Sequence, residues 1–189
     1  IGITLFAGET FTQCPLTVDH AVLLDMIHNI KCGLIEDGTA VGMGIANAVT
    51  RLKDSKAKSK VIILLTDGTN NKGDISPMTA AEIAKSFGIR VYTIGVGTNG
   101  MAPYPYPVGN TIQYVSMPVE IDEKTLTQIA GTTDGNYFRA TSNSKLKEVY
   151  EEIDKLAKSV LDSLGLDKQS GNHIAYGAIA RELKEVSRS

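Results

Sequence analysis

The strongest constraint on the fold is the run Val61–Leu65, in which five branched apolar residues follow one another without a polar break. A strand that is buried on both faces, as in the interior of a parallel sheet, has this composition. The run ends at Thr66 and Asp67, so this strand delivers a carboxylate to the carboxyl edge of the sheet. Open α/β sheets bind their ligands at that edge. The sequence therefore predicts a buried inner strand with a chemically useful side chain at its end.

Strand and helix patterns alternate along the rest of the chain. Apolar runs predict strands at 1–7, 11–16, 91–96, 111–115 and 137–140. Apolar residues at helical spacing predict helices at 18–30, 39–52, 78–87, 122–130 and 144–158, with N-caps at Thr17 and Asp122. This order predicts an α/β fold, a three-layer doubly wound and mostly parallel sheet with helices on both faces.

Two segments fall outside this alternation. Residues 97–110 include three prolines, so we expect an irregular loop there, because proline cannot donate to the ladder of a central strand. Residues 1–158 are expected to form one domain, and residues 159–189 a C-terminal extension of unknown role. In that extension the pattern favours a helix from Ile174 onward, capped by Asn172 and with one apolar side formed by Ile179, Leu183 and Val186.

The bulk composition excludes several classes of function. A chain of 189 residues with a net charge of −2 gives no support for a nucleic-acid partner or for contact of this chain with a membrane surface. The three histidines, His20, His28 and His173, lack the spacing of metal ligands. The two cysteines, Cys14 and Cys32, are either two buried reduced thiols or one bridge formed in an oxidising compartment.

Asp67 and Thr39 are the candidate site residues. Asp67 either caps the loop that follows its strand or helps to hold a hard divalent cation, because Mg²⁺, Mn²⁺ and Ca²⁺ prefer oxygen ligands. Thr39 follows Asp37 and Gly38 and either caps the helix that it opens or supplies a hydroxyl ligand. Both residues stand where a loop meets a regular element.

The sequence does not favour an enzyme. The glycines of Gly42–Gly44 lie inside a predicted helix rather than after a strand, and no phosphate-binding GxxxxGK[ST] loop occurs. A phosphatase loop would need an aspartate two positions before Asp67, where the chain has Leu65. No GxSxG motif for acyl transfer is present.

Several segments together resemble the von Willebrand factor A (vWA) domain, and more narrowly the BatA type of the bacterial aerotolerance operon. These segments are Phe6–Glu9, Asp37–Gly42, Ile62–Gly68, Val91–Gly97, Glu120–Leu126 and Ile129–Gly135. The likeness covers about residues 1–158. It implies a metal-ion-dependent adhesion site at the carboxyl edge, in which Thr39 and Asp67 match two of the family's ligands. The family's DxSxS motif has no counterpart in this chain.

The resemblance also implies that the central first strand of the sheet is missing, since this chain begins at the family's second strand. Such a gap leaves two strands with unpaired backbone groups, and buried unpaired groups are costly. Three solutions are open: upstream residues of a longer parent protein, strand exchange with another copy, or insertion of the C-terminal stretch 173–180.

The resemblance further implies a non-enzymatic protein-interaction module that binds Mg²⁺, Mn²⁺ or Ca²⁺ and a protein partner that donates a carboxylate to the metal. Thr39 and Asp67 supply only two of about six ligands, so the metal is expected to bind weakly and the site to be readily empty. The implied parent is a membrane-anchored bacterial cell-envelope protein linked to stress and oxygen tolerance, of which this chain is a soluble part. Two alternatives stay open. One is a metal-dependent phosphoryl-transfer or hydrolase domain with Asp67 as metal ligand and a second carboxylate such as Asp74 or Asp37, and the other is a scaffold without an active metal site.

Overall fold

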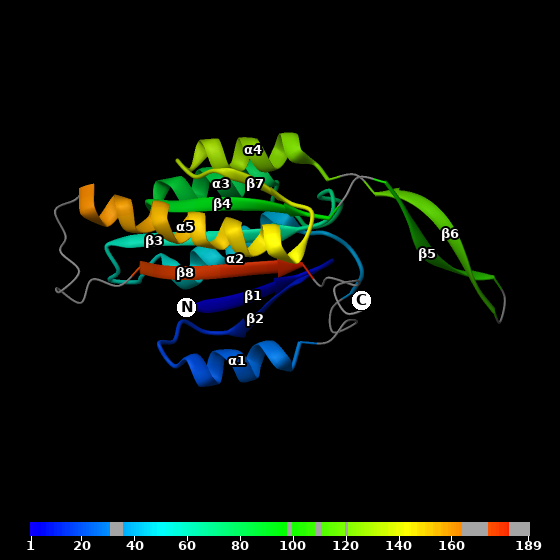
Figure 1. The fold of residues 1–189 in the computed structure, drawn as a ribbon, viewed down its shortest axis with the longest axis horizontal. Coiled ribbons are helices and arrows are strands. Elements are labelled where there is room, and N and C mark those ends of the chain that lie inside the picture. Colours follow the sequence, from blue (N-terminus) through cyan, green and yellow to red (C-terminus); the bar gives the residue numbers. More distant parts are fainter. Residues whose placement is uncertain (31–35, 98–99, 109–110, 120, 164–173, 182–189) are drawn as a thin grey trace.

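The computed structural model describes residues 1–30, 36–97, 100–108, 111–119, 121–163 and 174–181. These residues form a six-stranded sheet in the order β2-β1-β8-β3-β4-β7, with a separate two-stranded ribbon, β5-β6 (Figure 1). The sheet strands are β1 (Gly2–Phe6), β2 (Thr10–Cys14), β3 (Ser59–Thr66), β4 (Ile89–Val96), β7 (Tyr137–Ala140) and β8 (Ile174–Arg181). Neighbouring strands of the six-stranded sheet are parallel, except β1 and β2, which are antiparallel. The predicted α/β fold with a mostly parallel sheet is confirmed.

Helices lie on both faces of the sheet (Figure 1). One face carries α2 (Val41–Leu52), α3 (Pro77–Ser86) and α4 (Glu123–Thr132), and the other carries α1 (His20–His28) and α5 (Asn143–Ser163). Successive side chains of β3 point to opposite faces, as in any strand. Ile62 and Leu64 therefore pack with α2, α3 and α4, whereas Val61, Ile63 and Leu65 pack with α5. The predicted burial of this strand on both faces is confirmed.

The centre of the sheet is filled by β8. This strand pairs with β1 on one side, from Gly2↔Gly177 to Phe6↔Arg181, and with β3 on the other, from Ser59↔Ile174 to Leu65↔Ala180. Of the three solutions for the central gap, the structure therefore shows insertion of the C-terminal stretch. The helix expected from Ile174 onward is wrong over 174–181, because pairing on both sides satisfies the backbone groups of β1 and β3 as well as its own. The rest of that expected helix lies outside the described residues.

The last helix and β8 both extend the compact unit beyond residue 158. Helix α5 continues through Ser163, five residues past its expected end, and β8 joins the same sheet as β1. Part of the segment expected as an extension therefore contributes to the sheet itself.

The proline-rich segment forms a ribbon rather than an irregular loop, which corrects the expectation. Strand β5 (Gly100–Val108) pairs antiparallel with β6 (Thr111–Val119), and the ribbon projects from the sheet (Figure 1). Pro103, Pro105 and Pro107 stand at alternate positions, so their nitrogens all face the same way. Because β5 pairs with β6 alone among the strands that the structure describes, those nitrogens can all face away from the ladder without breaking it.

Helix ends are set by side chains near the predicted caps. Asp122 accepts a hydrogen bond from the Thr125 N–H at 3.0 Å, which confirms the predicted cap of α4. The cap of α1 is Asp19 instead of Thr17, whose hydroxyl accepts a bond from the Asp19 N–H. Cys14 is a buried free thiol, and Cys32 lies outside the described residues.

Candidate metal centre

The two predicted site residues lie on loops at the carboxyl edge of the sheet. Asp67 directly follows β3 and is partly buried, and Thr39 lies just before α2 with 1% of its surface exposed. Strands β1, β8 and β3 run parallel, so their carboxyl ends meet at this edge.

The Thr39 loop is fixed to the end of β1. The backbone N–H of Ala40 donates to the carbonyl of Ala7 at 2.7 Å, and the N–H of Gly8 donates to the carbonyl of Glu36 at 2.7 Å. Gly38 has a φ of +151°, and a Cβ there would stand 2.8 Å from the Cα of Gly8. The two turns therefore pass in direct backbone contact, which only glycine allows.

Two asparagines connect the loop after β3 to the Thr39 loop. The side-chain oxygen of Asn71 accepts from the Thr39 N–H at 2.8 Å, and the Asn71 N–H donates to the Thr39 carbonyl at 3.0 Å. The side-chain oxygen of Asn70 accepts from the Val41 N–H at 2.8 Å. We call Asn70 and Asn71 the asparagine clamp. The clamp holds Thr39 against the loop that carries Asp67.

The clamp also explains how α2 begins. Its N-cap residue is Ala40, which has no side chain to accept a hydrogen bond, and Asn70 supplies the acceptor from another loop. Thr39 is therefore not the N-cap that the sequence allowed. Sequence reasoning missed both asparagines because it treated 69–77 as a polar loop. No signal in the sequence pointed to them, because Thr39 stands where a cap of this helix was expected.

Gly42 lies where α2 meets the segment before α3. A Cβ on Gly42 would stand 2.0 Å from the carbonyl oxygen of Ile75, so no larger residue fits without a backbone shift. This close approach gives a packing reason for the glycine at position 42, which could otherwise be mistaken for part of a nucleotide-binding loop.

Asp67 and Thr39 offer the kinds of ligand that a hard cation prefers, but fewer ligands than such a cation needs. A carboxylate and a hydroxyl are ligands that Mg²⁺, Mn²⁺ and Ca²⁺ accept, but these cations take about six or more oxygens. Among the described residues, no group of three or more His, Cys, Asp or Glu side chains is placed to share a metal ion. Water would therefore supply most of the ligands of a cation held by Asp67 and Thr39.

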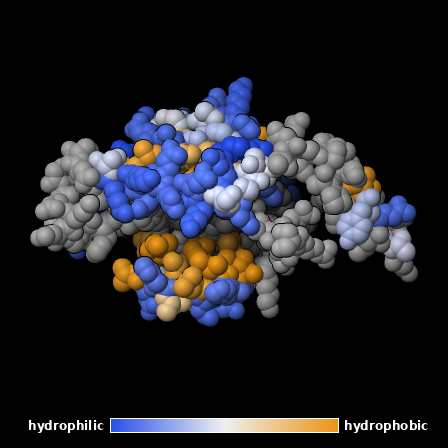
Figure 2. Space-filling view, viewed as in Figure 1, coloured by the Kyte–Doolittle hydropathy of each residue, from blue (hydrophilic) through white to orange (hydrophobic). Residues whose placement is uncertain are grey.

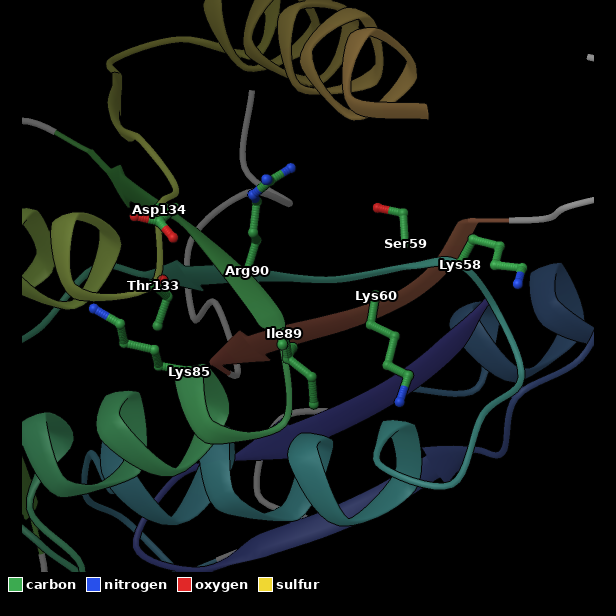
Figure 3. A pocket seen from close by; sticks show the side chains of 9 residues that line it. Lys58, Ser59, Lys60, Lys85, Ile89, Arg90, Thr133 and Asp134 are labelled. Carbon is green, nitrogen blue, oxygen red and sulfur yellow. The ribbon is translucent and has the colours of Figure 1, made fainter. Parts of the chain in front are cut away.

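A basic pocket lies at the opposite, amino edge of the sheet (Figure 3). It is lined by Lys58, Ser59, Lys60, Lys85, Gly88, Ile89, Arg90, Thr133 and Asp134. Lys60 is in register with Ile89 and Arg90 with Val61, so Lys60 and Arg90 project from opposite faces of the sheet. Lys60 also donates to the carbonyl of Lys53 at 2.7 Å. The cations diverge, and the pocket lacks the convergent donors of an anion site.

Comparison with known proteins decides the family. A family model described as the von Willebrand factor type A domain matches residues 1–152. The chain belongs to this family. The match ends before β8, so the central strand of this vWA sheet comes from outside the matched segment.

Solved structures support the assignment and narrow it. The vWA chain is 34% identical to BatB from Bacteroides thetaiotaomicron, with a TM-score of 0.69 over 83% of this chain and 78% of that one. It is 30% identical to an aerotolerance-related membrane protein from Bacteroides fragilis, with a TM-score of 0.67 over 82% and 78%. The resemblance to aerotolerance-type vWA proteins is confirmed. The first of these two structures is described as BatB, whereas the sequence suggested the BatA type.

A more distant vWA neighbour carries a metal. Proximal thread matrix protein 1 from the mussel byssus has zinc in its metal-ion-dependent adhesion site (MIDAS) motif. It is 27% identical to this chain, with a TM-score of 0.61 over 82% of this chain and 34% of that one. The chain spans about half the length of the curated relatives it matches. In the part of the chain that the structure describes, none of the helices combines the length and apolar character that crossing a bilayer requires.

Proposed function

We propose that this vWA domain is a protein-docking module that uses a divalent cation, Mg²⁺ or a similar Mn²⁺ or Ca²⁺, held at the carboxyl edge by Asp67 and Thr39. The observation that carries the proposal is the pairing of two loops. Asp67 directly follows β3, which is buried from Val61 to Thr66, and the loop that follows it is hydrogen-bonded through Asn71 to both backbone polar groups of Thr39. A carboxylate and a hydroxyl are therefore supported by rigid elements.

The chemistry of docking follows from the donor set. Asp67 would bind the cation directly through its carboxylate, and Thr39 would present its hydroxyl from a loop whose backbone is already fixed. A bound cation would supply a coordination position for a carboxylate of a partner protein. Two protein ligands of about six give low affinity for the free cation, so partner and metal would bind more strongly together than either alone.

We further propose that the parent protein is a membrane-anchored cell-envelope protein linked to oxygen tolerance, and that it has no catalytic role in this domain. The support is similarity to the aerotolerance-related membrane protein from Bacteroides fragilis. Fractionation of the parent protein tests the anchoring: it should sediment with membranes and resist extraction by high salt. Recovery in the soluble fraction would contradict it.

The metal site is tested by titrating the chain with Mn²⁺ and following free Mn²⁺ by electron paramagnetic resonance. We expect a single weak site with a dissociation constant on the order of 1 mM, as for the weakest oxygen-ligand modules. Asp67→Ala should weaken it at least tenfold, because the charged ligand is lost. Asp74→Ala, which removes an exposed carboxylate farther along the same loop, is the matched control and should bind within twofold of wild type. Equal binding by the Asp67 and Asp74 variants, or micromolar affinity in the wild type, would contradict the proposal.

A further inference from the structure

The amino edge of the sheet carries a dense group of cations. Strands β3 and β4 are parallel and both begin at this edge, and α2 and α3 end beside it in the connections that lead into them. The cations of this region, which we call the basic edge, are Arg51, Lys53, Lys56, Lys58, Lys60, Lys85 and Arg90. Four of them line one pocket, so they belong to a single surface (Figure 3). The two connections contain one acid, Asp54, and Asp134 lies nearby in the lining of the pocket.

In the described part of the chain, no ion pair neutralises the basic edge. The ion pairs between described residues are all formed by cations outside it. Arg51 and Lys60 donate to uncharged acceptors, the Thr12 hydroxyl at 3.1 Å and the Lys53 carbonyl at 2.7 Å. The three lysines of the connection 53–58 are exposed, as is Lys85 at the end of α3. These charges therefore face an outside partner.

The net charge of −2 hides the basic edge, because the carboxyl edge has the opposite sign. The loops that carry the candidate metal residues hold Glu36, Asp37, Asp67 and Asp74 against Lys72, which is itself paired with Glu36. The eight residues of β3 separate the two edges by roughly 25 Å, at about 3.3 Å per residue. Exposed charges are screened within about 10 Å at ordinary salt, so the acidic loops do not cancel the basic edge.

An exposed aromatic side chain lies among these cations. Phe87 is the C-cap of α3, in the turn between Lys85 and Arg90, and it is 46% exposed. On the face drawn in Figure 2 the surface over α5 is hydrophilic and apolar side chains gather around α1. An aromatic ring among cations is typical of a surface that lies against lipid. The ring enters the boundary between headgroups and acyl chains, and the cations attract anionic headgroups.

We infer that the basic edge and Phe87 form a surface that binds an anionic lipid bilayer. The cations diverge, which does not suit a single bound anion but suits a plane of headgroups with spread charge. The choice of lipid as the occupant rests on the proposed membrane-anchored parent, which the similarity to an aerotolerance-related membrane protein supports. In this orientation the carboxyl edge, with Asp67 and Thr39, points away from the bilayer and toward a docking partner.

The inference is tested by co-sedimentation of the chain with vesicles made of equal parts phosphatidylglycerol and phosphatidylcholine. We expect binding at about 0.05 M salt and at least a tenfold loss at about 0.5 M, because the attraction is screened. Vesicles of phosphatidylcholine alone should bind the chain at least tenfold more weakly. Absence of binding to the anionic vesicles at low salt, or equal binding to both kinds of vesicle, would overturn the inference.

Charge-reversal variants locate the surface. Lys56→Glu with Lys58→Glu should weaken vesicle binding at least tenfold, since each cation near an anionic surface contributes about fivefold in affinity. Lys124→Glu with Lys147→Glu is the matched control, because it makes the same change in net charge at exposed positions in the first turns of α4 and α5. The control should bind vesicles within threefold of wild type. Equal losses in the two variants would show that net charge alone decides the binding, and would contradict a specific surface.

Phe87→Ala separates a bilayer from other anionic partners. This variant should bind the vesicles about threefold or more weakly, because less apolar area enters the lipid. Phe11→Ala, which removes a ring of similar exposure from β2, should not weaken binding. Unchanged binding by Phe87→Ala, or tighter binding of the wild-type chain to double-stranded DNA than to the vesicles at equal salt, would overturn the assignment to lipid.

Lysine labelling tests the orientation, and metal binding separates this inference from the proposed function. Acetylation of Lys56, Lys58 and Lys85 should slow at least threefold on the vesicles, whereas acetylation of Lys72 and Lys147 should not. Equal protection of all five would overturn the orientation. The reversal variant of the basic edge should bind Mn²⁺ in solution like wild type. A parent protein that sediments with membranes while the chain ignores anionic vesicles would refute this inference and leave the proposed function standing.

Discussion

The two halves of the sheet on either side of β8 differ in how their faces are covered by helices and in how their edge strands are protected. Strands β3, β4 and β7 are covered by helices on both faces, and their edge strand is short and charged. Strands β1 and β2 are covered by α2 on one face and by the small helix α1 on the other, with apolar groups left outside and an uncharged edge. The half formed by β3, β4 and β7 is covered on both faces, whereas the half formed by β1 and β2 depends on β8 for its connection and leaves apolar side chains exposed.

The largest effect is expected when the connection between the halves is removed. A chain that ends after Ser163 lacks β8, so β1 and β3 each lose a parallel neighbour. Leaving several buried backbone groups unpaired at roughly 1–3 kcal/mol each exceeds the stability of a typical domain. We expect no cooperative urea transition by circular dichroism. A chain that ends after Arg181 retains β8 and should keep the transition; a normal transition in the shorter chain would show that β8 is dispensable.

A smaller effect on stability is expected from substitutions in α5 and α1, the two helices that cover the same face of the sheet. Ile153 of α5 is 1% exposed in the core cluster, whereas Leu24 of α1 is 55% exposed. Ile153→Ala should lower the free energy of unfolding by about 2–5 kcal/mol through cavity formation. Leu24→Ala should change it by less than about 0.5 kcal/mol, because more than half of the side chain is already exposed. Urea denaturation of both variants measures these changes, and similar losses in the two would contradict the expected difference between a buried and an exposed position.

The smallest effect concerns the asparagine clamp, which joins the loops of the two halves. Asn71→Ala leaves the Thr39 N–H without its acceptor and should lower stability by about 1–2 kcal/mol. Asn70→Ala removes a bond of equal length at the start of α2 and should lower stability by a similar amount. Only the Asn71 variant should also weaken Mn²⁺ binding, because only Asn71 fixes Thr39. Parallel losses of Mn²⁺ affinity in both variants would show that the clamp is merely structural.

Local pattern predicted the first half of the sheet well. The run Val61–Leu65 has no polar break, which is typical of a strand buried on both faces, and the cap at Asp122 is a contact within one turn. Signals of this kind are contained in the segment itself. The helix spacing of α2, α3 and α5 was recognisable for the same reason.

The errors arose where distant contacts decide the structure. Ile174–Arg181 has both helical spacing and strand-forming residues, and pairing with β1 and β3, more than a hundred residues away, selects the strand. The prolines of β5 are tolerated because that strand has one neighbour. The asparagine clamp could not be predicted because it joins two loops separated by about thirty residues.

We propose that Asp67 and Thr39 together hold a divalent cation at the carboxyl edge. Anomalous diffraction at the manganese edge, from crystals of the chain soaked in Mn²⁺, tests it most directly. We expect a manganese peak within about 2.0–2.6 Å of both the Asp67 carboxylate and the Thr39 hydroxyl oxygen. A manganese peak elsewhere, or refined positions in which those two oxygens are too far apart to share an ion, would contradict it.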